Sequence, residues 1–150
     1  MRDRVVRVLL VLMAVSSGFV GSWALLAPRS FYDDFPGGGR HWVSADGPYN
    51  EHLVRDVGGL NLAVTVVAVA AAIVLTRALV RTAAVATLAF AIPHVAYHSA
   101  HTDLYTTSDA VALVFSLGLA VVLPIVVLVV VSGPEDLRTV DYDKNGGQSG

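Results

Sequence analysis

The stretch AVALVFSLGLAVVLPIVVLVVV, from Ala110 to Val131, decides the fold. It contains no charged residue and a single proline, Pro124. A helix rises about 1.5 Å per residue, so about 20 apolar residues cross the roughly 30 Å hydrocarbon layer of a bilayer. Proline is tolerated there because neighbouring helices re-satisfy the carbonyl group that it frees. The stretch therefore predicts a transmembrane helix over residues 109–131.

Three more apolar runs lie upstream. They extend over Val8–Ala27, Val57–Thr76 and Thr82–Ala100. The middle run is expected to begin earlier as a helix, because Asp46 or Gly47 can cap it and Pro48 suits the first helical position. We therefore expect three further helices, over residues 8–27, 48–76 and 82–100.

The composition is typical of a membrane protein. Of the 150 residues, 55% are hydrophobic and only 15% are charged, which is outside the usual balance of a soluble domain. No stretch between the apolar runs is long enough to bury a core of its own. The predicted fold class is therefore all-α, with one four-transmembrane-helix bundle over residues 1–131.

The first apolar run also has the basic flank of a secretory signal peptide, with Arg2, Arg4 and Arg7 before it. A signal peptide has an apolar segment of about 7 to 15 residues, and the run Val8–Ala27 is longer. No clean cleavage site of small residues follows it. We therefore expect the run to be retained as a transmembrane helix.

Two segments lie outside the expected helices. The connection over residues 28–47 is rich in turn formers and aromatic residues, which favour the headgroup level of a membrane, so it predicts a folded extracytoplasmic loop. The segment 132–150 ends in NGGQSG and has too little apolar content to pack, so it predicts a disordered cytoplasmic tail.

The basic residues predict the orientation, because short cytoplasmic flanks are enriched in Lys and Arg. Four spans would bring most of these residues to one side: Arg2, Arg4, Arg7, Arg77, Arg81, Arg138 and Lys144. On the other side carboxylates outnumber arginines. The sequence therefore predicts a multi-pass protein of the plasma (inner) membrane with both termini cytoplasmic.

Charge and cysteine content narrow the classes of function. The net charge of −2 comes without a basic stripe, so nucleic acid is not an expected partner. The chain has no cysteine, which excludes disulfides, thiolate metal ligands and cysteine nucleophiles. A metal ion would have to be held by imidazole and oxygen.

The stretch IPHVAYHSAH, at the end of the third expected helix, carries three histidines in phase. At about 100° per residue, His94, His98 and His101 fall within about 60° on one helix face. Imidazole is costly in hydrocarbon without partners, so such a stripe is a functional-site hypothesis. The four-residue spacing of His94 and His98 also allows one helix to give two ligands to one metal ion.

The stretch YNEHLVRDVGG, at the start of the second expected helix, offers the remaining ligands: Glu51, His52 and Asp56. If the second and third helices are antiparallel neighbours, these residues and the histidine stripe lie at similar depth. Gly58 and Gly59 would allow the two backbones to approach closely. Asp103 and Asp109 could add a further ligand or orient an imidazole.

Structural alternatives exist for these residues. The histidines can be hydrogen-bonding residues of the membrane interface. Glu51 and Arg55 can form an exposed ion pair, which stabilises a helix little. Asp109 can belong to the N-terminal cap of the fourth helix.

The segments APRSFYDDFPGGGRHW, after the first helix, and NEHLVRDVGGLNLA, opening the second, accompany four helices with short loops. In these features the chain resembles the small four-helix bacterial membrane proteins called DoxX-like, particularly actinobacterial members, over about residues 8–131. The resemblance implies a four-helix membrane bundle and, for some members, an association with quinone or respiratory redox proteins. It supplies no catalytic residues.

The leading functional hypothesis is a transition-metal site near the extracytoplasmic face. His94, His98 and His101 would bind the metal, with His52, Glu51 or Asp56 completing the shell. Imidazole and carboxylate ligands suit zinc, iron, copper or manganese. A site with an open position could activate water or oxygen, with Glu51 as the catalytic base of a metal-dependent membrane enzyme.

Two other classes of function remain. One is a haem- or quinone-associated electron-transfer subunit, in which His94 or His98 would need an opposing ligand such as His52 to hold haem. The other is a non-catalytic accessory membrane subunit. Expected partners are the lipid bilayer and either a membrane redox protein or further copies of the chain.

Overall fold

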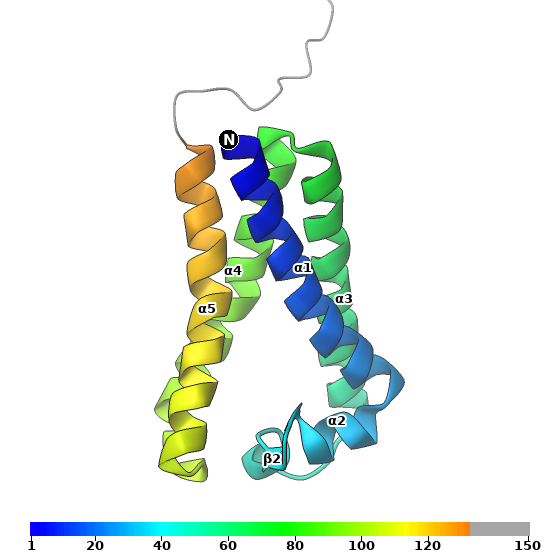
Figure 1. Ribbon diagram of the computed structural model, residues 1–150. Helices are drawn as coiled ribbons and strands as arrows, with labels where there is room; N and C mark the ends of the chain where they lie inside the picture. The colour runs from blue at the N-terminus through cyan, green and yellow to red at the C-terminus, as the bar shows by residue number, and fades with distance from the viewer. Residues whose placement is uncertain (133–150) are drawn as a thin grey trace, which may run out of the picture.

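The computed structural model describes residues 1–132 and is mostly helical (Figure 1). The five α-helices are α1 (Arg2–Leu26), α2 (Pro28–Asp34), α3 (Glu51–Val74), α4 (Arg77–Ala100) and α5 (Thr107–Val131). Two 3-10 turns, η1 (Ser44–Asp46) and η2 (Thr102–Leu104), and two short antiparallel strands, β1 (Pro36–Gly37) and β2 (Arg40–His41), complete the elements. Residues 133–150, which make up nearly all of the predicted tail, lie outside the described residues.

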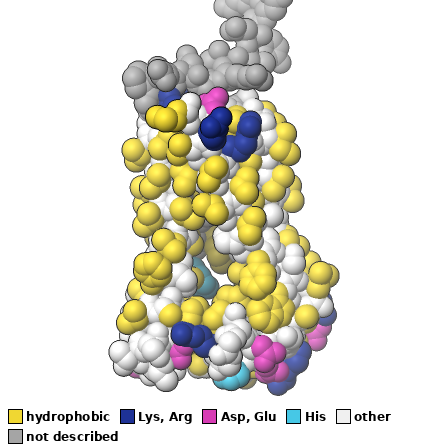
Figure 2. Space-filling view, viewed as in Figure 1, with side chains coloured by type: hydrophobic (Ala, Val, Ile, Leu, Met, Phe, Trp, Pro, Cys, Tyr) yellow, Lys and Arg dark blue, Asp and Glu magenta, His cyan; other side chains and the backbone are white. Residues whose placement is uncertain are grey.

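Four of the helices, α1, α3, α4 and α5, are long and apolar enough to cross a membrane. The predicted bundle of four spans is therefore confirmed, and the chain is a multi-pass membrane protein. The shortest of these helices has 24 residues, which corresponds to about 36 Å of length. Figure 2 shows hydrophobic side chains over the middle of the bundle, with charged side chains gathered at its two ends.

The helix boundaries differ from those that the apolar runs predict. Helix α3 begins at Glu51 rather than at Pro48, because the side chain of Asn50 accepts a hydrogen bond from the Leu53 N–H at 3.2 Å. Helix α4 begins at Arg77 rather than at residue 82, because the side chain of Thr76 accepts a hydrogen bond from the Leu79 N–H. Helix α1 begins at Arg2 and continues through the arginines that precede its apolar run. Polar caps, which hydropathy cannot detect, therefore define two of these ends.

The four long helices share a core only at one end of the bundle, which we call the closed end. The core joins buried residues from all four helices: Val6, Leu10, Met13, Ala71, Ala72, Leu75, Val80, Ala83, Ala84, Val127 and Val131. Toward the other end, which we call the open end, α1 and α3 diverge from α4 and α5 (Figure 1). The bundle is thus two helix pairs that are joined at the closed end.

Small residues bring α1 and α3 together. A Cβ atom on Gly58 would lie 2.6 Å from the backbone nitrogen of Leu25, and one on Gly21 would lie 2.9 Å from that of Leu62. Glycine is therefore required at both positions for the two backbones to approach so closely. The expectation that Gly58 and Gly59 line the contact of α3 with α4 is wrong, because Gly58 faces α1 and Gly59 has no such neighbour within 4 Å.

The segment over residues 27–50, which we call the connecting segment, folds against α1 and α3. Its aromatic side chains form a second core with Ala24 and Val54. In this core the rings of Phe31 and Phe35 lie 4.7 Å apart, and Trp23 of α1 contacts both. The segment therefore packs at the open end of the bundle, attached mainly to the α1/α3 pair.

Candidate functional site

Helix α4 brings two of the three predicted histidines into contact. The ring centroids of His94 and His98 lie 4.7 Å apart in an edge-to-face arrangement. The His94 ring also stacks on Phe90, one turn earlier, at 5.1 Å. Both imidazoles are half-buried. The four-residue spacing of the sequence therefore gives a real pair of adjacent imidazoles, lined by an aromatic ring.

His101 does not continue the stripe. It is the C-terminal cap of α4, with φ −121° and ψ 38°, so its side chain leaves the helical phase that was expected from the spacing. Its Nδ1 lies 2.8 Å from the carbonyl oxygen of Tyr97, and its ring stacks on that of Tyr97 at 4.2 Å. His101 is thus engaged with Tyr97.

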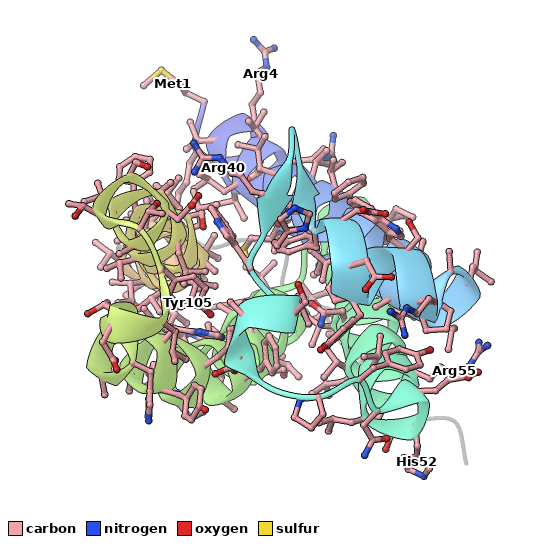
Figure 3. All side chains as sticks on the ribbon, turned by 90° about the horizontal axis from the view of Figure 1, so that it is seen from below. Met1, Arg4, Arg40, His52, Arg55 and Tyr105 are labelled. Carbon is pink, nitrogen blue, oxygen red and sulfur yellow. The ribbon has the colours of Figure 1, made fainter. Side chains whose placement is uncertain are left out.

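The predicted site residues of α3 pair with residues of their own helix. His52 Nδ1 lies 2.8 Å from Asp56 Oδ2, and Arg55 Nη2 lies 2.8 Å from Glu51 Oε1. All four side chains are exposed, and that of His52 is 85% accessible. In Figure 3, His52 and Arg55 lie at the edge of the molecule, far from Tyr105 on the α4 and α5 side. The ion-pair interpretation of Glu51 and Arg55 is confirmed.

The connecting segment supplies side chains that the sequence did not assign to the site. The Tyr97 hydroxyl donates to Asp46 Oδ1 at 3.1 Å, and the Tyr105 hydroxyl donates to the carbonyl oxygen of Trp42 at 3.1 Å. Tyr105 also lies 3.5 Å from Nδ1 of His98. The carboxylate of Asp46 interacts electrostatically with His98. The connecting segment therefore forms one wall of the histidine environment.

Tyr105 links the histidine pair to this wall. Burial of its hydroxyl, assisted by the negative charge of Asp46 and by Tyr97, raises the pKa of Tyr105 to about 12. Burial disfavours the charged phenolate, so the hydroxyl stays protonated at neutral pH. It therefore remains a hydrogen-bond donor to Trp42 under physiological conditions.

Asp109 holds the connecting segment against α5. Its Oδ1 accepts hydrogen bonds from Arg40 Nη1 at 2.8 Å and from Trp42 Nε1 at 3.0 Å. Its Oδ2 accepts from Thr106 Oγ1 at 2.8 Å, while its own N–H donates to that hydroxyl. Thr106 is the N-cap of α5 and Asp109 binds its hydroxyl, so the prediction that Asp109 belongs to this cap is correct but incomplete. Figure 3 shows Arg40 extending from the hairpin near α5.

We call the three residues Arg40, Trp42 and Asp109 the latch. Arg40 and Trp42 lie 69 and 67 residues before Asp109 in sequence, yet their bonds to it join the two helix pairs at the open end. Trp42 is 8% exposed, which is unusual for a residue of a connecting loop. The sequence signals for the latch were an arginine and a tryptophan two residues apart in the loop, Arg40 and Trp42, and the capping motif before α5.

Two hollows lie beside α4, and His94 lines one of them. Figure 2 shows an opening between α1 and α5 above the connecting segment, with histidine atoms at its back, where α4 lies. A separate groove of about 490 Å³ lies between α3 and α4. It is lined by Leu60, Ala86, Ala89, Phe90, Pro93, His94 and Tyr97. The His94 imidazole therefore lies in mostly apolar surroundings that open sideways between α3 and α4.

Within residues 1–132, no group of three or more histidine or carboxylate side chains is arranged to hold a metal ion. Of the six predicted ligands, His94 contacts His98 and His52 pairs with Asp56. The other two have separate partners: His101 contacts Tyr97, and Glu51 pairs with Arg55. The transition-metal site therefore remains a prediction, and so does the role of Glu51 as its catalytic base. Comparison of the chain with protein-family models, curated proteins and solved structures gives no match.

Proposed function

We propose that this membrane protein binds a quinone, or a similar planar ring with two carbonyl oxygens, at His94 and His98. The observation that carries the proposal is a pair of half-buried imidazoles in contact with each other, of which His94 lines an apolar groove between α3 and α4. Small-molecule sites are typically concave and apolar, with a few placed polar groups. A lipophilic molecule can enter such a site directly from the bilayer.

The chemistry of the residues fits such a ligand. A neutral imidazole carries one donor and one acceptor nitrogen, so it can donate a hydrogen bond to a carbonyl oxygen. Phe90 and Tyr97 add aromatic faces against which a planar ring can pack. The resemblance to DoxX-like proteins, some of which are associated with quinone, points in the same direction.

A transition metal is the second candidate, and one observation favours it. His94 and His98 are one turn apart with adjacent rings, and Asp46 lies close enough to interact with both electrostatically. Two adjacent imidazoles are suitable ligands for zinc, iron, copper or manganese. Because no third histidine or carboxylate of residues 1–132 is arranged to join them, water or a bound molecule would have to complete the shell.

The ligand is tested by titrating purified protein in lipid nanodiscs with a short-chain quinone and measuring quenching of tryptophan fluorescence. We expect saturable quenching whose dissociation constant rises about two- to tenfold in His98→Ala, because the loss of one hydrogen bond corresponds to about 0.5–1.5 kcal/mol. His52→Ala is the matched control and should bind as the wild type does, since His52 is exposed elsewhere.

Three outcomes contradict quinone binding. Quenching that does not saturate, and is equal in the wild type and both variants, would show only partition of the quinone into the bilayer. Elemental analysis of protein purified without added metal decides the second candidate: stoichiometric metal that disappears in His98→Ala would replace the quinone by a metal centre. A Soret band in the absorption spectrum would instead identify haem.

We also propose that the closed end faces the cytoplasm of the inner membrane. Within residues 1–132 the closed end carries five arginines, whereas at the open end carboxylates outnumber arginines. This distribution agrees with the enrichment of basic residues in cytoplasmic flanks. The open end, with the histidine pair, would then face the outside.

Single cysteines test this orientation, because the chain has none of its own. Ala45 and Ala78 are both exposed, the first within η1 at the open end and the second in the first turn of α4 at the closed end. In intact cells an impermeant thiol reagent should label Ala45→Cys and spare Ala78→Cys until the membrane is permeabilised. The reverse pattern of labelling would invert the proposed orientation.

A further inference from the structure

A second groove, unrelated to the histidine pair, lies between α1 and α3. Its volume is about 530 Å³. The floor is made of Ala14 and Ala72, which are buried, and the walls are made of larger, exposed side chains: Val11, Val15, Val69 and Ile73. Small residues on the floor between branched residues on the walls produce a narrow apolar channel along the two helices.

Arg7 lies in the lining of this groove and is its one charged member. Its Nε donates to the carbonyl oxygen of Ala72 at 3.0 Å, in the last turn of α3. This bond fixes the guanidinium beside the groove. It leaves Nη1 and Nη2, for which the structure gives no partner within residues 1–132. A guanidinium is suited to bind phosphate with two parallel hydrogen bonds.

We propose that this groove binds one acyl chain of an anionic phospholipid, with Arg7 contacting the phosphate. Lipid tails are as apolar as the groove itself, so the hydrocarbon contact alone gives little preference for any lipid. The charge supplies the preference, because the closed end carries Arg2, Arg4, Arg7, Arg77 and Arg81 against a single described carboxylate, Asp3. Basic residues beside a membrane span attract anionic lipids.

The proposal is tested on the full-length protein in nanodiscs of phosphatidylcholine, with and without phosphatidylglycerol. A ligand that binds only the folded state raises the thermal midpoint, and we expect the anionic lipid to raise it by about 2–4 °C. Arg7→Gln should lose most of this increase. Arg4→Gln is the matched control, because Arg4 is exposed at the same end but does not line the groove.

The measured quantity is the difference in thermal midpoint between the two lipid compositions. Loss of the bond to Ala72 would lower the midpoint of Arg7→Gln equally in both compositions, so it leaves this difference unchanged. Native mass spectrometry should retain one phosphatidylglycerol on the wild type and none on Arg7→Gln. Equal losses in Arg7→Gln and Arg4→Gln would overturn the proposal in favour of general charge attraction. Equal protection by glycerol phosphate, or a dimer without bound lipid, would also overturn it.

Discussion

Replacing Gly58 by alanine is expected to lower the free energy of unfolding by about 1–3 kcal/mol, the usual cost of inserting a methyl group into a packed contact. The new Cβ atom would lie 2.6 Å from the backbone nitrogen of Leu25 and 3.0 Å from the carbonyl oxygen of Gly21. Both neighbours are backbone atoms, which cannot move aside as a flexible side chain can. The helices α1 and α3 would have to separate.

Gly59→Ala is the control for this prediction, because a Cβ atom there meets nothing within 4 Å. Alanine is the better helix former by about 0.5–1 kcal/mol, so this variant should be as stable as the wild type or slightly more so. Reversible unfolding in mixed micelles, followed by circular dichroism, measures both variants. If Gly58→Ala matched Gly59→Ala in stability, the close approach of α1 and α3 would be refuted.

Replacing Asp109 by alanine is expected to release the connecting segment from α5. The substitution removes the acceptor of Arg40 and Trp42, and it also removes the acceptor of the Thr106 hydroxyl. Trp42 is buried in the wild type, so its release should shift its fluorescence emission to longer wavelength. Trp23→Phe provides a background in which Trp42 is the sole tryptophan.

Asp103→Ala is the matched control, because Asp103 is an exposed carboxylate in η2 that does not contact the latch. Its emission should equal that of the parent. Asp109→Asn should give an intermediate shift, since the amide oxygen can still accept from Trp42 but loses the ion pair with Arg40. An unchanged emission in Asp109→Ala would show that the latch does not hold the segment in place.

The four spans could be predicted from sequence because hydropathy depends on composition within one helix. The packing partners could not, because they depend on contacts between residues far apart. Gly58 and Gly59 are adjacent and chemically identical, yet only Gly58 meets a neighbouring backbone. Which of them does so depends on the rotation of α3 about its axis, and the period of a nearly uniform apolar helix does not specify that rotation.

In the candidate site, too, features within one helix could be predicted from sequence and contacts between distant segments could not. The spacing of His94 and His98 within one regular helix was enough to predict their contact. The spacing of His101 was not enough to predict its position, because α4 ends there and the backbone leaves the helical path. Asp46 and Trp42 reach the site from a connection whose path is set by aromatic packing against α1 and α3. No local pattern encodes that path.

The latch also constrains the order in which the protein can be completed during biosynthesis. Chains are made from the N-terminus, and their parts generally fold in that order. The contacts of the connecting segment with α1 and α3 are available once α3 has been made. Trp42 and Arg40 gain their common acceptor only when Asp109 arrives at the start of the last span. The open end can therefore be completed only after Asp109 has been made, and the closed-end core only after Val127 and Val131 have followed.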